Sequence, residues 1–200
     1  MTVNNTDAIE KLAANFFASD QSVARRIFHG RGHLFPGLEH VCIDWFRPLV
    51  LITAHAAIDD IEGLTEILLR ADELKQIRTI VLQNRFERGA PAQTIYGEAA
   101  GPIVAKEGNL LFDVHPGTQQ NCGLFLDMRC LRDWLLENSG EANVLNLFAY
   151  TCSLSVAAIA GGAKLVTNVD MSKTSIKWGE GNHTLNRQDL SNVHSVPHNL

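Results

Sequence analysis

Several features that would place a chain outside the ordinary globular proteins are missing from this sequence. No apolar run approaches the roughly 20 residues that a membrane-spanning helix needs. The first 17 residues contain acidic side chains but no basic n-region, so a signal peptide is not expected. There is no internal repeat and no low-complexity tract. These absences, together with a length of 200 residues, predict a cytoplasmic globular protein of one large domain or two small ones.

Cysteine is scarce and is not arranged for metal binding. The four cysteines are Cys42, Cys122, Cys130 and Cys152, and no two of them form a C-x-x-C pair. This pattern indicates reduced thiols rather than a disulfide framework or a zinc site. No metal site is therefore expected.

Positive charge is also in short supply. The formal net charge is −5, which argues against tight non-specific RNA binding, because contacts with phosphates need Lys and Arg. An RNA-binding surface would have to be local, or belong to sequence outside these 200 residues. Residues 25–33 form one basic segment, interrupted by glycines. This segment could touch an RNA backbone or be a solvated loop.

A glycine-rich phosphate-binding loop is missing where the strongest pattern in the chain would require one. Residues 144–148 and 165–169 are predicted as buried parallel strands, with a helix between them at residues 153–160 that ends at Gly161-Gly162. The turn after the first strand contains no glycine, so a pyrophosphate would be poorly held.

Asp170, at the carboxyl end of the second strand, is placed to accept both hydroxyls of a ribose. The alternative is that Asp170 caps the following helix. An acid at this position without a phosphate loop favours S-adenosylmethionine over a dinucleotide.

Three segments resemble a known family. Residues 146–173 read NLFAYTCSLSVAAIAGGAKLVTNVDMSK, residues 123–132 read GLFLDMRCLR, and residues 29–38 read HGRGHLFPGL. They are similar to motifs of the class I S-adenosylmethionine-dependent methyltransferases that modify 23S (large-subunit) ribosomal RNA. The resemblance runs from about residue 25 to the end of the chain, and it is most specific over residues 123–186. It implies an RNA substrate, with ribosomal RNA as the first candidate, and leaves a homodimer open.

The resemblance also implies where the cofactor lies. Asp127 and Arg129 match a segment that reaches over the cofactor, although a surface pair is the alternative. Near the end, His198 and Asn199 fall where the family places an acid that contacts the adenine. The turn after the first strand would hold the methionine half through its backbone amides and the following helix N-terminus. The expected cofactor contacts are Asn146, Phe148, Tyr150, Thr151, Asp127, Arg129, Asp170, Met171 and Asn199.

Alternatives and departures accompany these assignments. Phe148 and Tyr150 could equally be core aromatics. Cys152 stands where the family usually has glycine, which crowds the turn; it is interpreted as a small buried residue rather than a nucleophile. The family's catalytic Asp-Pro-Pro motif and later cysteine should follow the third strand, beyond Leu200. The catalytic residues are thus unknown, and the 200-residue chain alone is not expected to be active.

The rest of the chain predicts an α/β protein. Residues 1–100 would form a small α+β accessory domain that helps to position RNA, and residues 101–200 the first part of a Rossmann-like, class I methyltransferase domain, incomplete at its C-terminus. The expected helices are 5–18, 65–74, 128–138 (capped by Asp127, with Leu131, Trp134 and Leu135 inward) and 174–185, with a second helix or turn at 21–27. The expected strands are 40–46, 49–54, 77–83 and 194–200, with a hairpin at 103–114 and a linker at 90–102.

The sequence therefore predicts an S-adenosylmethionine-dependent enzyme that methylates a nitrogen or carbon of an RNA base. Two other classes stay open. One is a non-catalytic nucleoside-binding or scaffold protein that keeps the fold. The other is a nicotinamide-dependent oxidoreductase, against which the missing glycine loop argues.

Overall fold

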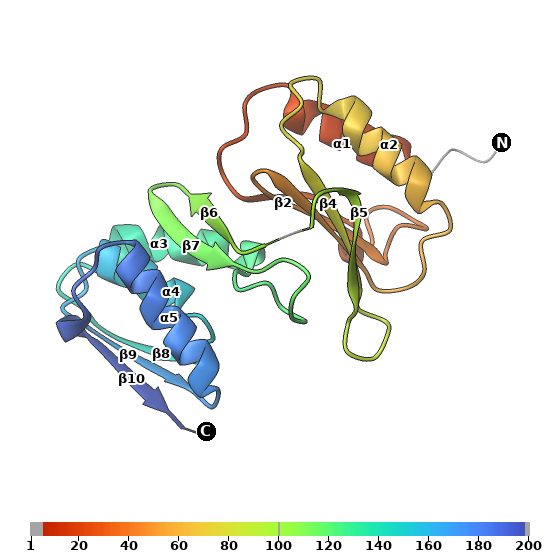
Figure 1. Cartoon of the computed structure of the whole chain (residues 1–200). Helices are drawn as coiled ribbons and strands as arrows, with labels where there is room; N and C mark the ends of the chain where they lie inside the picture. The colour runs from red at the N-terminus through yellow and green to blue at the C-terminus, as the bar shows by residue number, and fades with distance from the viewer. Residues whose placement is uncertain (1–5, 100, 199–200) are drawn as a thin grey trace. The chain divides into compact units, whose positions relative to one another are not determined.

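The computed structural model describes residues 6–99 and 101–198 (Figure 1). The chain divides into two compact units. The N-terminal unit comprises Met1–Ala105 and His115–Cys122, and the C-terminal unit comprises Lys106–Val114 and Gly123–Leu200. The segment 115–122 thus belongs to the first unit, which a single boundary near residue 100 does not anticipate. In the described part of the chain, no helix has the length and apolar character needed to cross a membrane.

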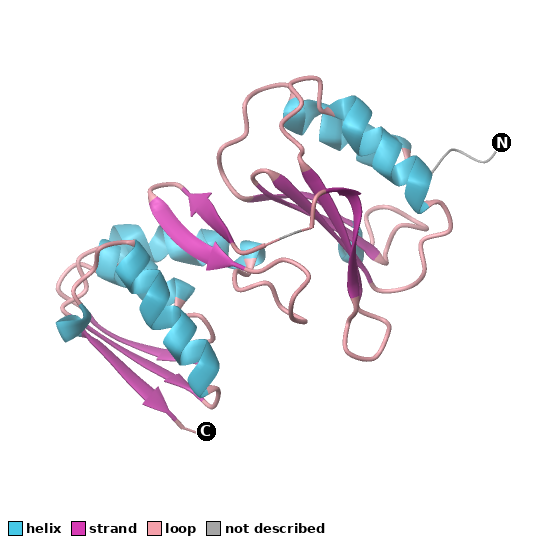
Figure 2. Cartoon of the chain, viewed as in Figure 1, coloured by secondary structure: helices cyan, strands magenta, loops and turns pink. Residues whose placement is uncertain are grey.

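The N-terminal unit is a five-stranded mixed sheet with two helices on one face (Figures 1 and 2). The strand order is β1-β2-β3-β4-β5, antiparallel except for the parallel β3–β4 pair. Its elements are α1 Asp7–Phe17, β1 Arg25–His29, the 3-10 turn η1 Gly30–Gly32, β2 Val41–Phe46, β3 Leu49–Ala54, α2 Ile61–Ala71, β4 Thr79–Asn84 and β5 Ala92–Gly97. This part of the chain thus combines helices with a mainly antiparallel sheet.

The two helices pack on the sheet through regularly spaced apolar residues. In α1, Ile9, Ala13 and Phe17 are buried, which is one residue per turn on a single face. In α2, the buried residues are Leu64 and Leu68. This helix begins four residues earlier than predicted, because the side chain of Asp60 caps it by accepting a hydrogen bond from the Gly63 amide at 2.8 Å.

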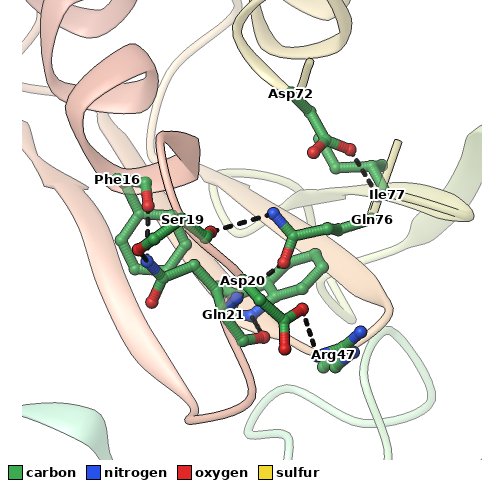
Figure 3. Close-up of polar contacts among 9 residues, drawn as sticks. Phe16, Ser19, Asp20, Gln21, Arg47, Asp72, Gln76 and Ile77 are labelled. Carbon is green, nitrogen blue, oxygen red and sulfur yellow. Dashed lines mark hydrogen bonds and ion pairs between the residues drawn. The ribbon is translucent and has the colours of Figure 1, made fainter. Parts of the chain in front are cut away.

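The predicted helix or turn at 21–27 is wrong, because polar contacts hold the chain extended there (Figure 3). The Gln21 amide donates to Oε1 of Gln76 at 2.6 Å, and the Gln21 carbonyl accepts from the Trp45 indole at 3.0 Å. The Gln76 side chain also donates to the carbonyl of Ser19 at 3.1 Å. These backbone groups are therefore not available for a helix, and the chain continues into β1.

The predicted linker at 90–102 is wrong over residues 92–97, which form the edge strand β5. Alanine, glycine and threonine in this stretch do not exclude a strand when one face stays exposed. Most of its residues are exposed or half-buried, as is usual at the edge of a sheet.

The C-terminal unit contains a parallel sheet of order β10-β9-β8 and the hairpin β6–β7. Its elements are β6 Ile103–Glu107, β7 Leu110–Val114, η2 Leu126–Met128, α3 Arg129–Asn138, β8 Asn143–Leu147, α4 Ser153–Ala160, β9 Leu165–Asp170, α5 Lys173–Leu185, η3 Leu190–Asn192 and β10 Val193–Pro197. The predicted hairpin, strand–helix–strand unit, following helix and third parallel strand are present, the last over residues 193–197. The predicted burial of the first strand of this unit is wrong: within β8, the edge strand of the sheet, Asn146 is buried, whereas Leu145 and Leu147 are exposed.

Two details of α3 differ from the prediction. Its N-cap residue is Met128, without a side-chain capping bond, so Asp127 does not cap it. Its buried residues are Arg132 and Leu135, whereas Leu131 and Trp134 are exposed. Arg132 is fully buried because Glu107 of β6 receives its guanidinium in a two-pronged ion pair, at 2.5 and 2.7 Å. The guanidinium also lies over the ring of Phe112, 5.6 Å from its centroid.

Candidate cofactor-binding site

The carboxyl ends of the three parallel strands meet at one edge of the sheet of the C-terminal unit. Phe148 directly follows β8, Asp170 ends β9, and the His198 amide after β10 donates to the carbonyl of Asp170 at 3.0 Å. Ligands of open parallel sheets bind outside this edge. The structure therefore brings the predicted residues Phe148, Asp170 and Met171 together. The predicted contact Asn199 lies outside the described residues.

The turn after β8 has an unusual backbone. Phe148, Tyr150 and Cys152 have φ values of 54°, 48° and 58°, so every second residue takes the left-handed conformation, although none is glycine. Such a conformation costs a non-glycine residue about 1–2 kcal/mol. Three of these residues within five positions mark the turn as a strained segment, and strained segments concentrate at ligand-binding sites.

Asp170 holds this turn in place. Its Oδ2 accepts a hydrogen bond from the Tyr150 amide and its Oδ1 accepts one from the Ser172 amide, both at 2.8 Å. The alternative role as the cap of α5 is wrong, because the N-cap is Ser172, whose hydroxyl accepts from the Ser175 amide. Asp170 is half-buried, and each of its oxygens keeps room for another donor.

Two predicted contacts are buried within the unit. Asn146 lies inside β8 rather than in the turn, and its amide donates to Oδ1 of Asn168 at 2.8 Å. Thr151 is 1% exposed; its hydroxyl donates to the carbonyl of Gly123 and its own carbonyl accepts from Asn182. Both side chains form hydrogen bonds with other residues of the unit, so they support the site without being exposed to a ligand.

The asparagine contact continues into a chain of hydrogen bonds through the buried side chains of Asn168, Ser155 and His183. Asn168 donates to the hydroxyl of Ser155 at 3.0 Å, and Ser155 lies 2.9 Å from Nε2 of His183. Nδ1 of His183 lies 2.6 Å from Oε1 of Gln188, whose amide nitrogen donates to the Val156 carbonyl. The contact with the Gln188 oxygen favours a proton on Nδ1. Burial lowers the pKa of His183, and the contacts with Gln188 and the charge of Glu180 oppose this only in part.

Aromatic side chains form one wall of the turn. The ring of Tyr150 lies 5.3 Å from that of Phe125 and 6.2 Å from that of Trp178. Gly123 permits this arrangement, since its φ is +106° and a Cβ there would come within 2.5 Å of the Trp178 ring. Tyr150 is thus a half-buried member of an aromatic group rather than a core residue. Phe148 is 78% exposed, so the core alternative is wrong for Phe148.

Sequence reasoning missed the face of α5 that supports this wall. Trp178, Asn182 and Asn186 are spaced one turn apart, and all three bond the backbone of β7. The Asn186 amide group bonds both the amide and the carbonyl of Leu111, at 2.9 and 2.6 Å. Asn182 accepts from the Asp113 amide at 2.8 Å, and the Trp178 indole donates to the Asp113 carbonyl at 3.1 Å. The spacing of these polar residues at i, i+4 and i+8 was the available signal.

Cys152 is buried, as predicted. It is 1% exposed, and burial, assisted by the charges of Asp170 and Glu180, raises its pKa to about 12. A thiol in this state is protonated and a poor nucleophile.

Asp127 and Arg129 lie on the exposed side of the unit. Asp127 is exposed in η2, and Arg129 pairs with Asp133 of its own helix at 3.6 Å. The alternative prediction is a surface pair between Asp127 and Arg129. Arg129 instead forms its ion pair with Asp133. The predicted contacts of Asp127 and Arg129 with the cofactor remain a prediction.

Large apolar side chains are exposed around the edge. Phe148 is 78% and Met171 71% exposed, and Leu147 and Phe125 are also exposed. Apolar side chains gathered in this way usually mark a binding site.

Comparison with known proteins agrees with this geometry. Residues 25–200 match the family described as S-adenosylmethionine-dependent methyltransferase. The chain belongs to this family. S-adenosylmethionine is the family's cofactor, as predicted.

Two relatives of this chain carry the same name. Ribosomal RNA large subunit methyltransferase K/L of Pseudoalteromonas translucida is 35% identical over 163 residues, which cover 77% of this chain and 23% of that protein. The protein of that name from Psychrobacter sp. is 44% identical over 88 residues, covering 44% of this chain and 11% of the relative.

Solved methyltransferase structures match over the whole chain. A Streptococcus mutans protein described as an S-adenosylmethionine-dependent methyltransferase has a TM-score of 0.79 and 26% identity. A second structure, of SMU.776 in complex with SAH, has a TM-score of 0.80 and 26% identity. The predicted α/β fold is thus confirmed. The chain spans 54% and 53% of these two chains, and less than a quarter of the curated relatives.

Proposed function

We propose that this chain forms the cofactor-binding part of an enzyme that methylates a base of RNA, with large-subunit ribosomal RNA as the substrate. The observation that carries the proposal is Asp170, held at the carboxyl edge of the sheet beside a strained turn. The names of the relatives support the RNA substrate. We also propose a cytoplasmic location, where such a substrate would be met.

The residues at this edge fit S-adenosylmethionine. The Asp170 carboxylate has acceptor capacity left for the ribose hydroxyls, because each oxygen accepts one amide hydrogen bond. Phe148 and Met171 offer apolar surface to the adenine and the thioether region. The N-terminus of α4, which begins at Ser153, provides amides and a positive dipole end for the methionine carboxylate.

When bound, the cofactor supplies an electrophilic methyl group on a sulfonium. The contribution of this chain is to bind and orient the donor. Asp170 fixes both the turn and the ribose, so one side chain couples the shape of the site to its occupancy. Orientation of this kind can provide much of the acceleration of a transfer reaction. Arg129 and Asp127 are proposed to close over the methionine half, with the guanidinium on the carboxylate and the acid on the ammonium.

Calorimetric titration of S-adenosylmethionine tests the proposal. We expect binding by the wild-type chain, a loss of at least tenfold in affinity with Asp170→Asn, and no change with Glu137→Gln, an exposed acid of α3. Phe148→Ala is a second variant, because an exposed side chain can be truncated without loss of the fold. Equal binding by all four proteins would contradict the assignment of the site.

Two further measurements, a titration with NAD and a methyl-transfer assay, distinguish the other function classes. NAD binding without S-adenosylmethionine binding would favour an oxidoreductase. S-adenosylmethionine binding without methyl transfer to ribosomal RNA, measured on a chain extended to the length of its relatives, would favour a nucleoside-binding scaffold.

A further inference from the structure

One end of the five-stranded sheet of the N-terminal unit collects cationic side chains from four neighbouring strands. The register pairs His29 with Cys42, Val41 with Ala54, and Ala54 with Asn84, so these strands begin or end in line. The residues just beyond them are therefore neighbours. They include His40, His55 and Arg85.

Backbone hydrogen bonds fix this alignment. The His55 amide donates to the His40 carbonyl at 2.7 Å, and the Arg85 amide donates to the Ala54 carbonyl at 2.8 Å. Arg31 lies in η1, immediately after β1, at the same end. Arg88 follows in the loop between β4 and β5. We call the group Arg31, His40, His55, Arg85 and Arg88 the basic rim.

The electrostatic environment of His55 is consistent with the proximity of Arg31, Arg85 and His40. Its pKa is lowered first by burial and then by the positive charges of Arg31, Arg85, Arg26 and His40. No carboxylate appears among the causes. The rim thus brings several cationic side chains together within a chain whose net charge is −5.

The arginines of the rim differ from most others in the chain. Arg26, Arg47, Arg70, Arg129 and Arg132 each pair with a carboxylate. Within the described residues, Arg31, Arg85 and Arg88 form no such ion pair. Arg85 instead donates to the Gln120 carbonyl at 2.8 Å and to the side chain of Asn121, which orients it without neutralising it.

The carboxylates of this unit lie mainly elsewhere. Most are in or beside the two helices: Asp7, Glu10, Asp59, Asp60, Glu62, Glu66, Asp72 and Glu73. Those nearest the rim in sequence are Glu39 and Glu87. Glu87 accepts a hydrogen bond from Asn84 at 2.8 Å. The carboxylates at the N-terminus of α2 follow β3 and lie toward the same end of the sheet, but none of the ion pairs among the described residues joins a carboxylate to Arg31, Arg85 or Arg88.

An exposed aromatic residue stands inside the rim. Phe86, between Arg85 and Arg88, is 46% exposed in the loop after β4. Cationic side chains beside an exposed aromatic ring are the usual composition of a surface for single-stranded nucleic acid, where the ring stacks on a base. Among the described residues, no three histidines, cysteines or carboxylates gather as a metal-binding group, so the histidines of the rim are not assembled as metal ligands.

We propose that the basic rim binds the sugar-phosphate backbone of single-stranded RNA, with Phe86 stacking on a base. The choice of RNA among polyanions rests on the proposed function. The assignment of the surface rests on the geometry of the N-terminal unit alone. The same unit supplies its own control, because Arg25 and Arg78 are exposed and unpaired at the opposite end of the sheet.

The test is the salt dependence of RNA binding, measured by fluorescence anisotropy with a labelled single-stranded fragment of large-subunit ribosomal RNA. Arg31→Gln/Arg88→Gln is compared with Arg25→Gln/Arg78→Gln, which makes the same change of charge. Each phosphate contact on a single strand contributes about 0.7 to the slope of log K against log salt. We expect the rim variant to lose about 1.4 from the slope and roughly 20-fold in affinity at 0.1 M salt, and the control to match wild type.

Further arms distinguish the ligand and the fold. Phe86→Ala should weaken RNA binding but leave the dissociation constant for heparin unchanged, since heparin has no bases. Titration of S-adenosylmethionine should be the same for every variant, which shows that the chain is folded and keeps the two proposals separate. Equal slopes for the rim and control variants, or no RNA binding by wild type at 50 mM salt, would overturn the inference.

Discussion

Cys152 and Gly179 fit together as a complementary pair. A Cβ added to Gly179 of α5 would lie 2.4 Å from Sγ and 2.7 Å from Cβ of Cys152. The side chain of Cys152 therefore occupies the space that an alanine in α5 would need. The family resemblance places glycine at position 152. This chain instead has the larger cysteine in the turn, and it has a glycine without a side chain, Gly179, at the helix position that faces it.

This packing predicts a coupled response to substitution. Gly179→Ala should destabilise the chain by about 1–3 kcal/mol, because the added methyl group overpacks the contact with Cys152. Combining it with Cys152→Gly should recover most of the loss, since the glycine removes the clash and suits the positive φ at position 152. Urea unfolding of the two single variants and the double variant measures the coupling. Additive effects would contradict direct packing.

The buried ion pair between Arg132 and Glu107 predicts a different response. Arg132→Met should cost about 3–5 kcal/mol, because it leaves the Glu107 carboxylate buried and unpaired. Arg132→Met together with Glu107→Leu should be considerably less destabilising, since both charges are then removed. The exposed pair of Arg70 and Glu10 provides the control, and Arg70→Met should change stability by less than about 1 kcal/mol.

His183 predicts a loss of stability in acid. Burial lowers its pKa in the folded state, so between that value and the unfolded value of about 6.5 the unfolded chain binds more protons. The contribution of His183 is complete above pH 6.5 and declines as the pH falls through this window. Unfolding should thus become easier from pH 7.5 to pH 5. His183→Gln should lessen this dependence, and an unchanged pH profile would show that other groups cause it.

The sequence predicts elements well where one pattern dominates. Two short apolar runs and the glycines at 161–162 locate β8, α4 and β9, and the acid at position 170 follows directly. Prediction from the sequence fails where contacts between residues distant in the chain determine the secondary structure. The strand β1 depends on Gln76 and Trp45, and the buried face of α3 depends on Glu107, which pairs with an arginine that the pattern assigns to the surface.

The candidate site shows the same limit. Asp170 and the exposed Phe148 and Met171 could be located from the sequence, because strand ends define the edge. The buried positions of Asn146 and Thr151 could not, since they depend on Asn168 and on Gly123 across the unit. The basic rim is a property of strand register, which no local pattern in the sequence reveals.

The bonds from α5 to β7 have a consequence for the solution behaviour of the protein. An unpaired strand edge is a template on which a strand of another molecule can assemble. Asn186, Asn182 and Trp178 use the backbone groups of Leu111 and Asp113 that such a strand would need. Side chains of α5 thus occupy the backbone groups at the β7 edge of the hairpin, and this prevents a strand of another molecule from pairing there.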